Sequence, residues 1–275
     1  MNTIEGPVLS VITVVRNDPC GLRRTAESMA EQGASRFEWI VIDGDSTDET
    51  KDVLDSIHDQ AKIVLSEPDT GIFNAMNKGV GLSLGRYINF MNAGDVFAEK
   101  LVLREIIPVL DGNACDIVYG DYEECFSGGL TRYRRATDVE DIVFVAPTRH
   151  QSIFYRREIL VENPYDESLK VASDWCHLFD AIHGGATTRY VPRAIARFDM
   201  SGKSQREWKL GFKEQVQHLQ HAGIWTPEVM RRYRYIKMHK MLAKNLEAVL
   251  PRWLWFKIAE TKKRLFSGVQ ERDSR

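Results

Sequence analysis

The chain has 275 residues and a mass of 31.5 kDa, and 43% of its residues are hydrophobic while 28% are charged. These proportions are typical of a globular protein with a sizeable core and exclude an intrinsically disordered chain. No stretch reaches the roughly 18 to 20 apolar residues of a membrane span, and the N-terminal MNTIEGPVLS lacks the features of a secretory signal. The four cysteines are scattered without metal-ligand spacing, which indicates reduced thiols in a cytoplasmic protein.

The net charge of −2 is the sum of two regions of opposite sign. Residues 203–275 contain 17 Lys and Arg against 7 Asp and Glu, a balance of +10, so residues 1–202 carry −12. This asymmetry predicts regions with different tasks. We therefore expect a globular domain over residues 1–202 and a basic, amphipathic helical extension over residues 203–275.

The first part of the chain alternates between β-branched apolar runs and segments of helical periodicity. Buried strands are predicted at residues 8–15, 37–43, 61–66 and 87–92. Helices are predicted over residues 19–32 and 72–83, and an S-x-x-E pattern at residues 46–49 predicts a capping box that begins a further helix. The alternation implies right-handed crossovers and a mainly parallel sheet with helices on both faces.

After residue 110 the alternation changes. Strands are predicted at residues 116–122, 131–135 and 150–155, and a helix over residues 174–182. From residue 204 the sequence is helical, with breaks near residues 224–227 and at Pro251. We accordingly divide the globular domain into halves of about residues 1–110 and 111–202.

Polar residues follow each of the first four predicted strands. They are Arg16 and Asn17, then Asp43, then residues 66–69, and then residues 92–95. Because the carboxyl ends of parallel strands meet at one edge of a sheet, where ligands bind, we expect these side chains along one rim. The alternative is that they only cap the helices that follow.

A rim rich in carboxylates repels nucleotide phosphates unless a divalent cation lies between them. Mg²⁺ or Mn²⁺ takes one or two carboxylates and completes its shell with phosphate and water. Asp95, at a strand end that contains a glycine, fits that role, and Asp43 is placed to accept hydrogen bonds from a base or ribose. Neither a P-loop nor a G-x-G-x-x-G motif after a strand is present, which disfavours P-loop phosphoryl transfer and dinucleotide redox chemistry.

Three blocks in order, LSVITVVRND, IVIDGDSTDET and SEPDTGIFNAMNKGVGLSLGRYINFMNAGD, resemble family 2 glycosyltransferases, nearest the bacterial polysaccharide-assembly type similar to colanic-acid glycosyltransferases. The resemblance covers roughly residues 8–95 and returns at HQSIFYRRE and ASDW. It implies a GT-A fold over residues 1–202, with a Rossmann-like mixed, mainly parallel sheet. It also implies inverting transfer of a hexosyl or N-acetylhexosaminyl group from a nucleotide-sugar, with uracil as the expected base and guanine or thymine left open.

The resemblance also implies roles for individual residues. Donor binding is expected of Arg16, Asn17, Asp43, Asp45, Glu67, Asp69, Lys78, Asn92 and Asp95. Among these, Asp43 matches the acid that contacts the nucleoside, and Lys78 is placed to order the donor site. Residues 92–95 occupy the position of the D-x-D metal motif, but Asn92 replaces its first acid. Asp95 is therefore expected to bind the Mn²⁺ or Mg²⁺ cofactor.

Inverting transfer is a single displacement at the anomeric carbon, so a general base must accept the proton of the attacking hydroxyl. Asp174 matches the base position of the family; the alternative is a carboxylate that only stabilises the N-terminus of a helix. His150 and Gln151 resemble the H-Q pair on the acceptor side. His150 is also an alternative base, or a buried and hydrogen-bonded histidine.

The Q-x-x-R-W motif of processive synthases is absent, so we expect one sugar to be added per binding event. Residues 201–204 are expected either to close over the donor diphosphate as a lid or to act as a linker. Two other functions compete with the glycosyltransferase reading. They are a sugar-nucleotide nucleotidyltransferase and a non-catalytic, glycosyltransferase-like membrane assembly subunit.

The basic tail combines clustered Lys and Arg with aromatic residues, a composition typical of helices that lie on anionic membranes. We expect residues 203–275 to hold the protein on the inner face of the cytoplasmic membrane, near a polyprenyl-diphosphate-linked saccharide acceptor. The alternative is that the aromatic residues pack against the globular domain. A nucleic-acid partner is not expected, because the acidic domain would repel phosphate.

Overall fold

The computed structural model describes residues 6–112, 115–126, 131–199 and 206–249. The chain divides into two compact units, residues 1–218 and residues 219–275. The predicted boundary between residues 202 and 203 falls in a segment outside the described residues and stays a prediction, as does the lid or linker at residues 201–204.

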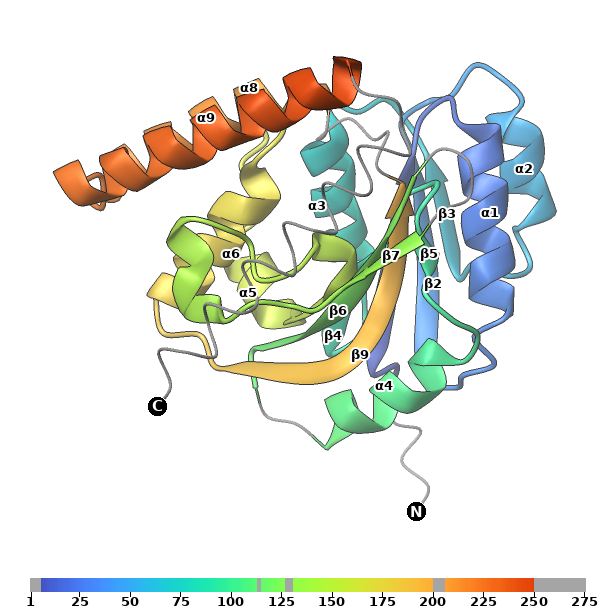
Figure 1. The fold of residues 1–275 in the computed structure, drawn as a ribbon. Helices are drawn as coiled ribbons and strands as arrows, with labels where there is room; N and C mark the ends of the chain where they lie inside the picture. The colour runs from blue at the N-terminus through green and yellow to red at the C-terminus, as the bar shows by residue number, and fades with distance from the viewer. Residues whose placement is uncertain (1–5, 113–114, 127–130, 200–205, 250–275) are drawn as a thin grey trace. The chain divides into compact units, whose positions relative to one another are not determined.

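The first unit is built on a nine-stranded sheet in the order β3-β2-β1-β4-β8-β6-β9-β5, with β7 paired to β6 (Figure 1). The strands are β1 Leu9–Val15, β2 Phe37–Asp43, β3 Ile63–Ser66, β4 Tyr87–Phe90, β5 Val96–Phe97, β6 Ile117–Cys125, β7 Thr131–Arg134, β8 Ile153–Arg156 and β9 Thr188–Asp199. The first four are parallel, as predicted, while β8 runs antiparallel between β4 and β6. Because β8 reverses direction, β6 ends at the same edge of the sheet as β1 to β4, and β9 runs parallel to β6.

Helices cover both faces of this sheet, and Figure 1 shows α1 and α2 on one side and α3, α5 and α6 on the other. The helices are α1 Pro19–Ala30, α2 Thr50–Ser56, α3 Ile72–Leu82, α4 Val102–Asp111, α5 Arg157–Glu162, α6 Ser173–His183, α8 Trp208–His221 and α9 Pro227–Val249, with 3₁₀ helices η1 Val139–Val143 and η2 His150–Ser152. The sheet therefore has the mixed α/β architecture of the predicted GT-A class.

The burial of β1 explains why its run of β-branched residues forms a central strand. All seven of its residues are buried, and the alternation of side chains along a strand divides them between the two faces of the sheet. Val11 and Val15 belong to one apolar cluster with Leu22 of α1 and Leu54 of α2. On the other face, Gly79 lets α3 approach β1 closely, because a Cβ there would lie 2.5 Å from Cγ2 of Ile12.

Two local predictions are wrong. The S-x-x-E pattern does not form a capping box, because α2 begins only at Thr50 and the buried Ser46 hydroxyl donates to Asp43 instead. The predicted strand at residues 150–155 begins as the 3₁₀ turn η2, and β8 starts at Ile153. The strands β5 and β9 and the helices α4 and α5 were not predicted. The strand β5 and the helix α5 are short, whereas the buried residues of α4 do recur at helical spacing.

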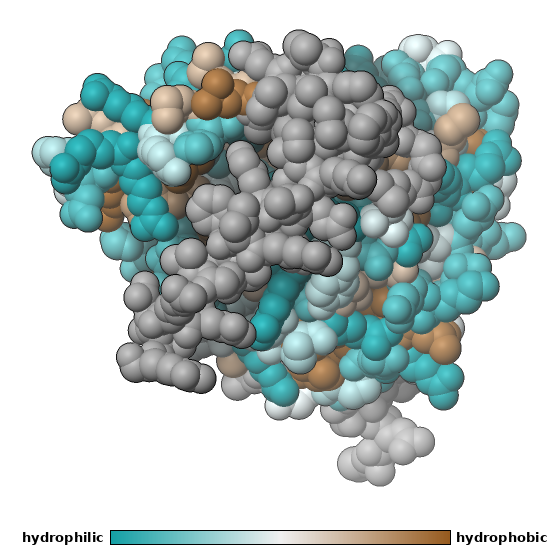
Figure 2. Space-filling view, viewed as in Figure 1, coloured by the Kyte–Doolittle hydropathy of each residue, from teal (hydrophilic) through white to brown (hydrophobic). Residues whose placement is uncertain are grey.

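The second unit contains the described part of α9, and the break predicted near residues 224–227 is present before it. Trp225 packs edge-on against Tyr233, with ring centroids 5.2 Å apart. No helix among the described residues is long and apolar enough to cross a membrane. On the face drawn in Figure 2, the coloured surface is mostly hydrophilic, with small separate apolar patches.

Candidate active site

The first three parallel strands bring their terminal polar residues to one edge of the sheet. The register places Asp43, at the end of β2, beside Val15 on one side and Ser66 on the other. Gly44 donates its backbone N–H to the carbonyl of Val15. The predicted rim is therefore present, and the loops after β1, β2 and β3 are neighbours.

Asp43 is fully buried at the centre of this rim. Its carboxylate accepts hydrogen bonds from the backbone N–H of Ser46 at 3.0 Å, from the Ser46 hydroxyl, and from the Ser66 hydroxyl at 2.6 Å. Hydrogen bonds to a charged acceptor are stronger than those between neutral groups. Asp43 thus joins the ends of β2 and β3, and Ser46 and Ser66 are its partners, which the sequence patterns did not identify.

The loop after β1 is joined to the loop after β2 through Asn17. The Asn17 backbone N–H donates to the Ser46 hydroxyl at 2.8 Å, and its side-chain oxygen accepts from the Thr47 N–H at 2.9 Å. Asn17 and Asp45 have positive φ angles of 51° and 58°, a region that residues other than glycine visit rarely. Such backbone conformations concentrate at functional sites, and both side chains are exposed on the rim.

A close approach brings Asp69 against the backbone of Gly44. A Cβ at residue 44 would lie 2.2 Å from Oδ2 of Asp69 and 3.3 Å from Cδ of Arg16. Only glycine leaves room for this arrangement. The structure therefore groups Arg16, Gly44 and Asp69 around the predicted nucleoside site.

Lys78 on α3 lies against the acidic loop that follows β3. Its ammonium group is 2.7 Å from a carboxylate oxygen of Glu67 and donates to the carbonyl of Pro68 at 2.8 Å. Asp69 in turn accepts from the N–H of Gly71 at the start of α3. These contacts attach Lys78 to the loop that carries Glu67 and Asp69, and its expected role in ordering the donor site stays a prediction.

Thr25 of α1 makes hydrogen bonds to the backbone of the predicted metal loop, residues 92–95. The buried Thr25 hydroxyl is within 2.8 Å of the carbonyl of Asp95 and accepts from the N–H of Gly94 at 3.1 Å. Gly94 has a φ of 93°, and a Cβ there would lie 3.2 Å from a guanidinium nitrogen of Arg24. Sequence reasoning missed Thr25 and Arg24. The only signal for Thr25 was a polar residue on the apolar face of a helix.

Asn92 and Asp95 offer oxygen atoms suited to a hard divalent cation. The side-chain oxygen of Asn92 is buried and has no hydrogen-bond partner among the described residues, while Asp95 accepts from the side-chain amide of Gln151 at 2.7 Å. No group of three or more His, Cys, Asp or Glu residues in the described part of the chain is arranged to hold a metal. The donor set thus fits an ion that takes few protein ligands, with phosphate oxygens completing its shell.

His150 and Asp174 lie in contact across the rim from this loop. The Nδ1 atom of His150 is 3.4 Å from Oδ2 of Asp174, and its Nε2 atom is 3.3 Å from the side-chain nitrogen of Asn92. Because an amide nitrogen only donates, this geometry makes Nε2 the acceptor and leaves the proton of a neutral His150 on Nδ1, facing Asp174. The structure therefore brings together Asn92, His150 and Asp174, which are far apart in the sequence.

Asp174 is in the first turn of α6, and its side chain is 28% exposed. Its other carboxylate oxygen accepts from the backbone N–H of Trp175 at 2.8 Å. Behind it lie Tyr155 and Tyr165, which are fully buried or nearly so. Burial first, and the negative charge of Asp174 to a lesser extent, raises the pKa of the Tyr155 hydroxyl far above its usual value, so it stays protonated.

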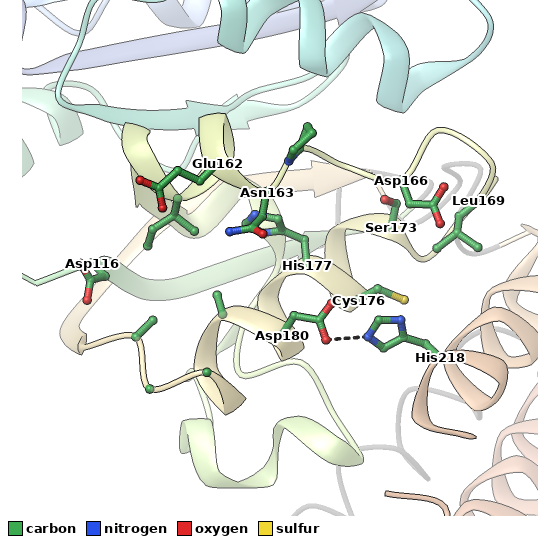
Figure 3. A pocket seen from close by; sticks show the side chains of 16 residues that line it. Asp116, Glu162, Asn163, Asp166, Leu169, Ser173, Cys176, His177, Asp180 and His218 are labelled. Atoms are coloured by element: carbon green, nitrogen blue, oxygen red, sulfur yellow. Dashed lines mark hydrogen bonds and ion pairs between the residues drawn. The ribbon is translucent and has the colours of Figure 1, made fainter. Parts of the chain in front are cut away.

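A further cavity among the described residues is separate from this rim. It has a volume of about 720 Å³ and lies along α5 and α6, where Figure 3 shows His177 and Asn163 near its centre and the ion pair of Asp180 with His218 at one end. Neither Asp174 nor His150 lines it. Its size alone does not make it the site, because the predicted functional residues converge elsewhere.

Comparisons with known proteins identify a family and related chains. The family model described as "Glycosyl transferase family 2" matches residues 10–189. The protein named "PGL/p-HBAD biosynthesis glycosyltransferase" in Mycobacterium bovis (strain BCG / Pasteur 1173P2) is 30% identical over 205 residues, which cover 72% of this chain and 79% of that protein.

Two solved structures share the fold. S. aureus TarS 1-349 in complex with UDP-GlcNAc superposes with a TM-score of 0.61 at 17% identity, over 77% of this chain and 66% of that one. The mannosyltransferase PcManGT from Pyrobaculum calidifontis, in complex with GDP-Man and Mn²⁺, has a TM-score of 0.62 at 15% identity, over 95% of this chain and 81% of that one. This chain spans only 39% of the longer TarS chain that also matches.

Proposed function

This chain belongs to glycosyl transferase family 2, and we propose that it is a metal-dependent, inverting glycosyltransferase that moves a sugar from a nucleotide-sugar to a lipid-linked saccharide in surface polysaccharide assembly. The observation that carries the proposal is the meeting of Asn92 and Asp95 with His150, Gln151 and Asp174 at one rim. The nucleotidyltransferase alternative is disfavoured, because the family transfers glycosyl groups.

We assign donor binding to the loops after β1, β2 and β3. Arg16, Asn17, Asp45 and Asp69 present exposed or half-buried polar groups there, and the buried Asp43 fixes the loops that carry them. A direct contact between Asp43 and the nucleoside would add to these hydrogen bonds or replace one. UDP is the expected nucleotide, and the neighbours that bind UDP-GlcNAc and GDP-Man make uracil and guanine the first bases to test.

Asn92 and Asp95 are the residues that would hold Mn²⁺ or Mg²⁺. The unpartnered oxygen of Asn92 would supply the second protein ligand in place of the missing acid. When bound, the cation neutralises charge that develops on the leaving diphosphate. Gln151 orients the Asp95 carboxylate by donating to it, and Thr25 fixes the loop backbone.

Asp174 is placed to act as the general base. In this scheme one of its carboxylate oxygens takes the proton of the acceptor hydroxyl, while the hydroxyl oxygen bonds to the anomeric carbon and the bond to the nucleoside diphosphate breaks. The Nδ1 atom of His150 lies 3.4 Å from Oδ2 of Asp174, close enough to orient the carboxylate in this scheme. His150 is therefore a positioning residue in the proposal, because its other nitrogen is occupied by Asn92.

The second unit is assigned to the surface of the cytoplasmic membrane. On α9 the exposed side chains of Tyr235, Met238 and Leu242 fall at i, i+3 and i+7, which places them on one stripe of the helix. Exposed Arg231 and Arg234 flank this stripe. The helix α9 is only weakly amphipathic over its whole length. The support for a peripheral helix therefore comes from this stripe, whose apolar side chains would insert beside cations that bind anionic headgroups. The aromatic and basic residues after residue 249 lie outside the described residues.

The donor assignment is tested by a panel of nucleoside diphosphates and nucleotide-sugars with Mn²⁺. A cognate nucleotide raises the melting temperature of the chain, because a ligand that binds only the folded state stabilises it. We expect stabilisation and Mn²⁺-dependent release of a nucleoside diphosphate from one donor class. The absence of release from every UDP-, GDP- and TDP-sugar would instead favour the non-catalytic subunit.

The membrane assignment is tested by flotation of the full chain with anionic and neutral vesicles. We expect flotation with anionic vesicles only, and Met238→Asp combined with Leu242→Asp should reduce the bound fraction at least about fivefold, since each exposed anchor adds of order 1 kcal/mol. The matched control is Arg104→Gln, an exposed change on α4 of the first unit. Equal flotation of both variants would refute the role of α9.

A further inference from the structure

Three arginines converge on a single buried carboxylate at the end of β6. Glu124 is 3% exposed, and its Oε2 atom accepts from Nε of Arg132 at 2.8 Å and from Nε of Arg134 at 3.0 Å. A terminal nitrogen of Arg149 lies 4.0 Å from its Oε1 atom. Among the described residues, no other carboxylate forms an ion pair with these three arginines. The cluster therefore carries two positive charges in excess.

The guanidinium groups are partly exposed to solvent, and that of Arg149 is held in a fixed orientation. The three arginine side chains are between 32% and 37% exposed, so each presents part of its guanidinium to solvent. Arg149 is stacked over the rings of Phe198 at 4.9 Å and Tyr122 at 5.6 Å, which fixes its plane. Its Nε atom is buried without a hydrogen-bond partner. Planar guanidinium groups held in this way suit bidentate binding of a phosphate.

The cluster lies on the acceptor side of the rim. Arg149 directly precedes His150 and Gln151 in the sequence. Phe198, over which Arg149 is stacked, belongs to β9, and β9 is paired with β5, the strand that follows Asp95. Three strand spacings separate β5 from β7, so the backbone of β7 lies on the order of 14 Å from that of β5, the strand that follows the metal loop. Arg149 lies nearer, two residues before Gln151, which donates to Asp95, so it connects the cluster to the acceptor side of the rim.

We propose that Arg132, Arg134 and Arg149 form a binding site for the phosphate group of the acceptor. The inference deepens the proposed function and rests on its lipid-linked acceptor. A diphosphate between saccharide and lipid would neutralise the surplus charge, and its docking would direct the terminal hydroxyl of the saccharide toward Asp174. Glu124 keeps the guanidinium groups together when no ligand is bound.

The test measures binding of geranyl diphosphate to the full chain by calorimetry, with uncharged geraniol as the comparison ligand. We expect the diphosphate to bind and geraniol to bind at least tenfold more weakly. Arg134→Gln and Arg149→Gln should each raise the dissociation constant for the diphosphate about tenfold, which corresponds to one charged hydrogen bond. Arg104→Gln, an equal change of charge on α4, should leave it unchanged.

The donor diphosphate is the other source of phosphate, and competition separates the two. Saturating UDP or GDP with Mn²⁺ should not displace geranyl diphosphate, and the donor dissociation constants should be the same in the variants and the wild type. Displacement by either nucleotide, or a tenfold loss of donor affinity in Arg149→Gln, would overturn the proposal. So would equal diphosphate affinity in all variants.

Two controls separate a loss of diphosphate binding from a loss of folding or of charge. Melting curves identify a variant that does not fold; if Arg134→Gln does not fold, Arg149→Gln decides, because Arg149 donates no hydrogen bond to Glu124 within 3.5 Å. Arg149→Lys, which keeps the charge, should recover part of the affinity. Release of nucleoside diphosphate from the donor is measured in parallel. Its absence in the wild type would remove the proposed function, whereas retained release with unchanged diphosphate binding would remove only this site.

Discussion

The two halves of the rim hold their polar residues in different ways. In the nucleotide half, Asp43 is fully buried and its carboxylate accepts three hydrogen bonds from Ser46 and Ser66. In the other half, which here means the metal loop of residues 92–95 together with His150 and Asp174 and is called the acceptor half, Asn92 keeps a buried oxygen without a partner among the described residues, and the Asp174 carboxylate is partly exposed. The hydrogen bonds of Asp43 are therefore made within the chain, whereas the Asn92 oxygen and the Asp174 carboxylate are groups that a ligand could bind.

The difference in burial and hydrogen bonding suggests that Asp43 and Asp174 have different roles. A buried, fully hydrogen-bonded carboxylate stabilises the loops that carry it, whereas an exposed carboxylate beside unsatisfied groups is available to a metal or a proton. Substitutions in the acceptor half should therefore change activity with little effect on folding. Substitutions at the buried centre of the nucleotide half should change stability first.

Asp174→Asn should have the largest effect on activity. An amide cannot take the proton of the acceptor hydroxyl, so transfer should fall by about 10²- to 10⁴-fold while donor affinity and melting temperature stay near those of the wild type. The measurement is the single-turnover release of nucleoside diphosphate, with calorimetry for the donor. His150→Gln, which removes only the orienting contact, should lose less. Near wild-type release by Asp174→Asn would place the base elsewhere, with His150 next to be tested.

Asp95→Ala should remove metal-dependent donor binding. The loss of a direct ligand is expected to weaken Mn²⁺-dependent donor affinity by at least about 100-fold, the upper end of what the loss of an outer-shell partner costs. Calorimetric titration of donor with and without Mn²⁺ gives the ratio directly. The folded state should be retained, because Asp95 is half-buried at the surface of the loop. Unchanged titration in the presence of Mn²⁺ would refute its role.

Asp43→Asn should affect stability more than chemistry. It leaves either the backbone N–H or the hydroxyl of the buried Ser46 without its acceptor, which costs about 1–3 kcal/mol of the free energy of unfolding and lowers the melting temperature by about 2–10 °C. The control is Asp45→Asn, an exposed position with φ of 58° where asparagine is also tolerated. Equal melting temperatures for the two variants would mean that the buried hydrogen bonds do not distinguish the two acids.

The sequence predicted the nucleotide half well, because that half is made of parallel strands with crossovers. Strand periodicity located β1 to β4, and the rule that their carboxyl ends meet placed Asp43 at one edge, together with Asp95 of the acceptor half. Local hydrogen bonds were harder to predict from the sequence. Ser46 matches a capping pattern, but its hydroxyl donates to the buried carboxylate of Asp43. A four-residue pattern carries no information about the end of β2, where Asp43 accepts the hydrogen bond that the pattern assigned to a helix N-terminus.

The acceptor half was predictable only through family resemblance. The contact between His150 and Asp174 depends on β8 entering the sheet in reverse, between β4 and β6, and no periodicity encodes that choice. The same insertion places Arg149 beside β6 and β7 and so creates the arginine cluster. Contacts between side chains of distant segments depend on the pairing of strands, which is decided by tertiary packing.

The metal loop and the pair of His150 and Asp174 should form a single site. Mn²⁺ is paramagnetic, so with UDP or GDP present it should broaden the NMR signals of the His150 ring, which contacts Asn92, and spare His58, which follows α2 at the opposite edge of the sheet. Asp95→Ala should abolish the broadening. Broadening that spares His150, or that persists unchanged in Asp95→Ala, would contradict the claim.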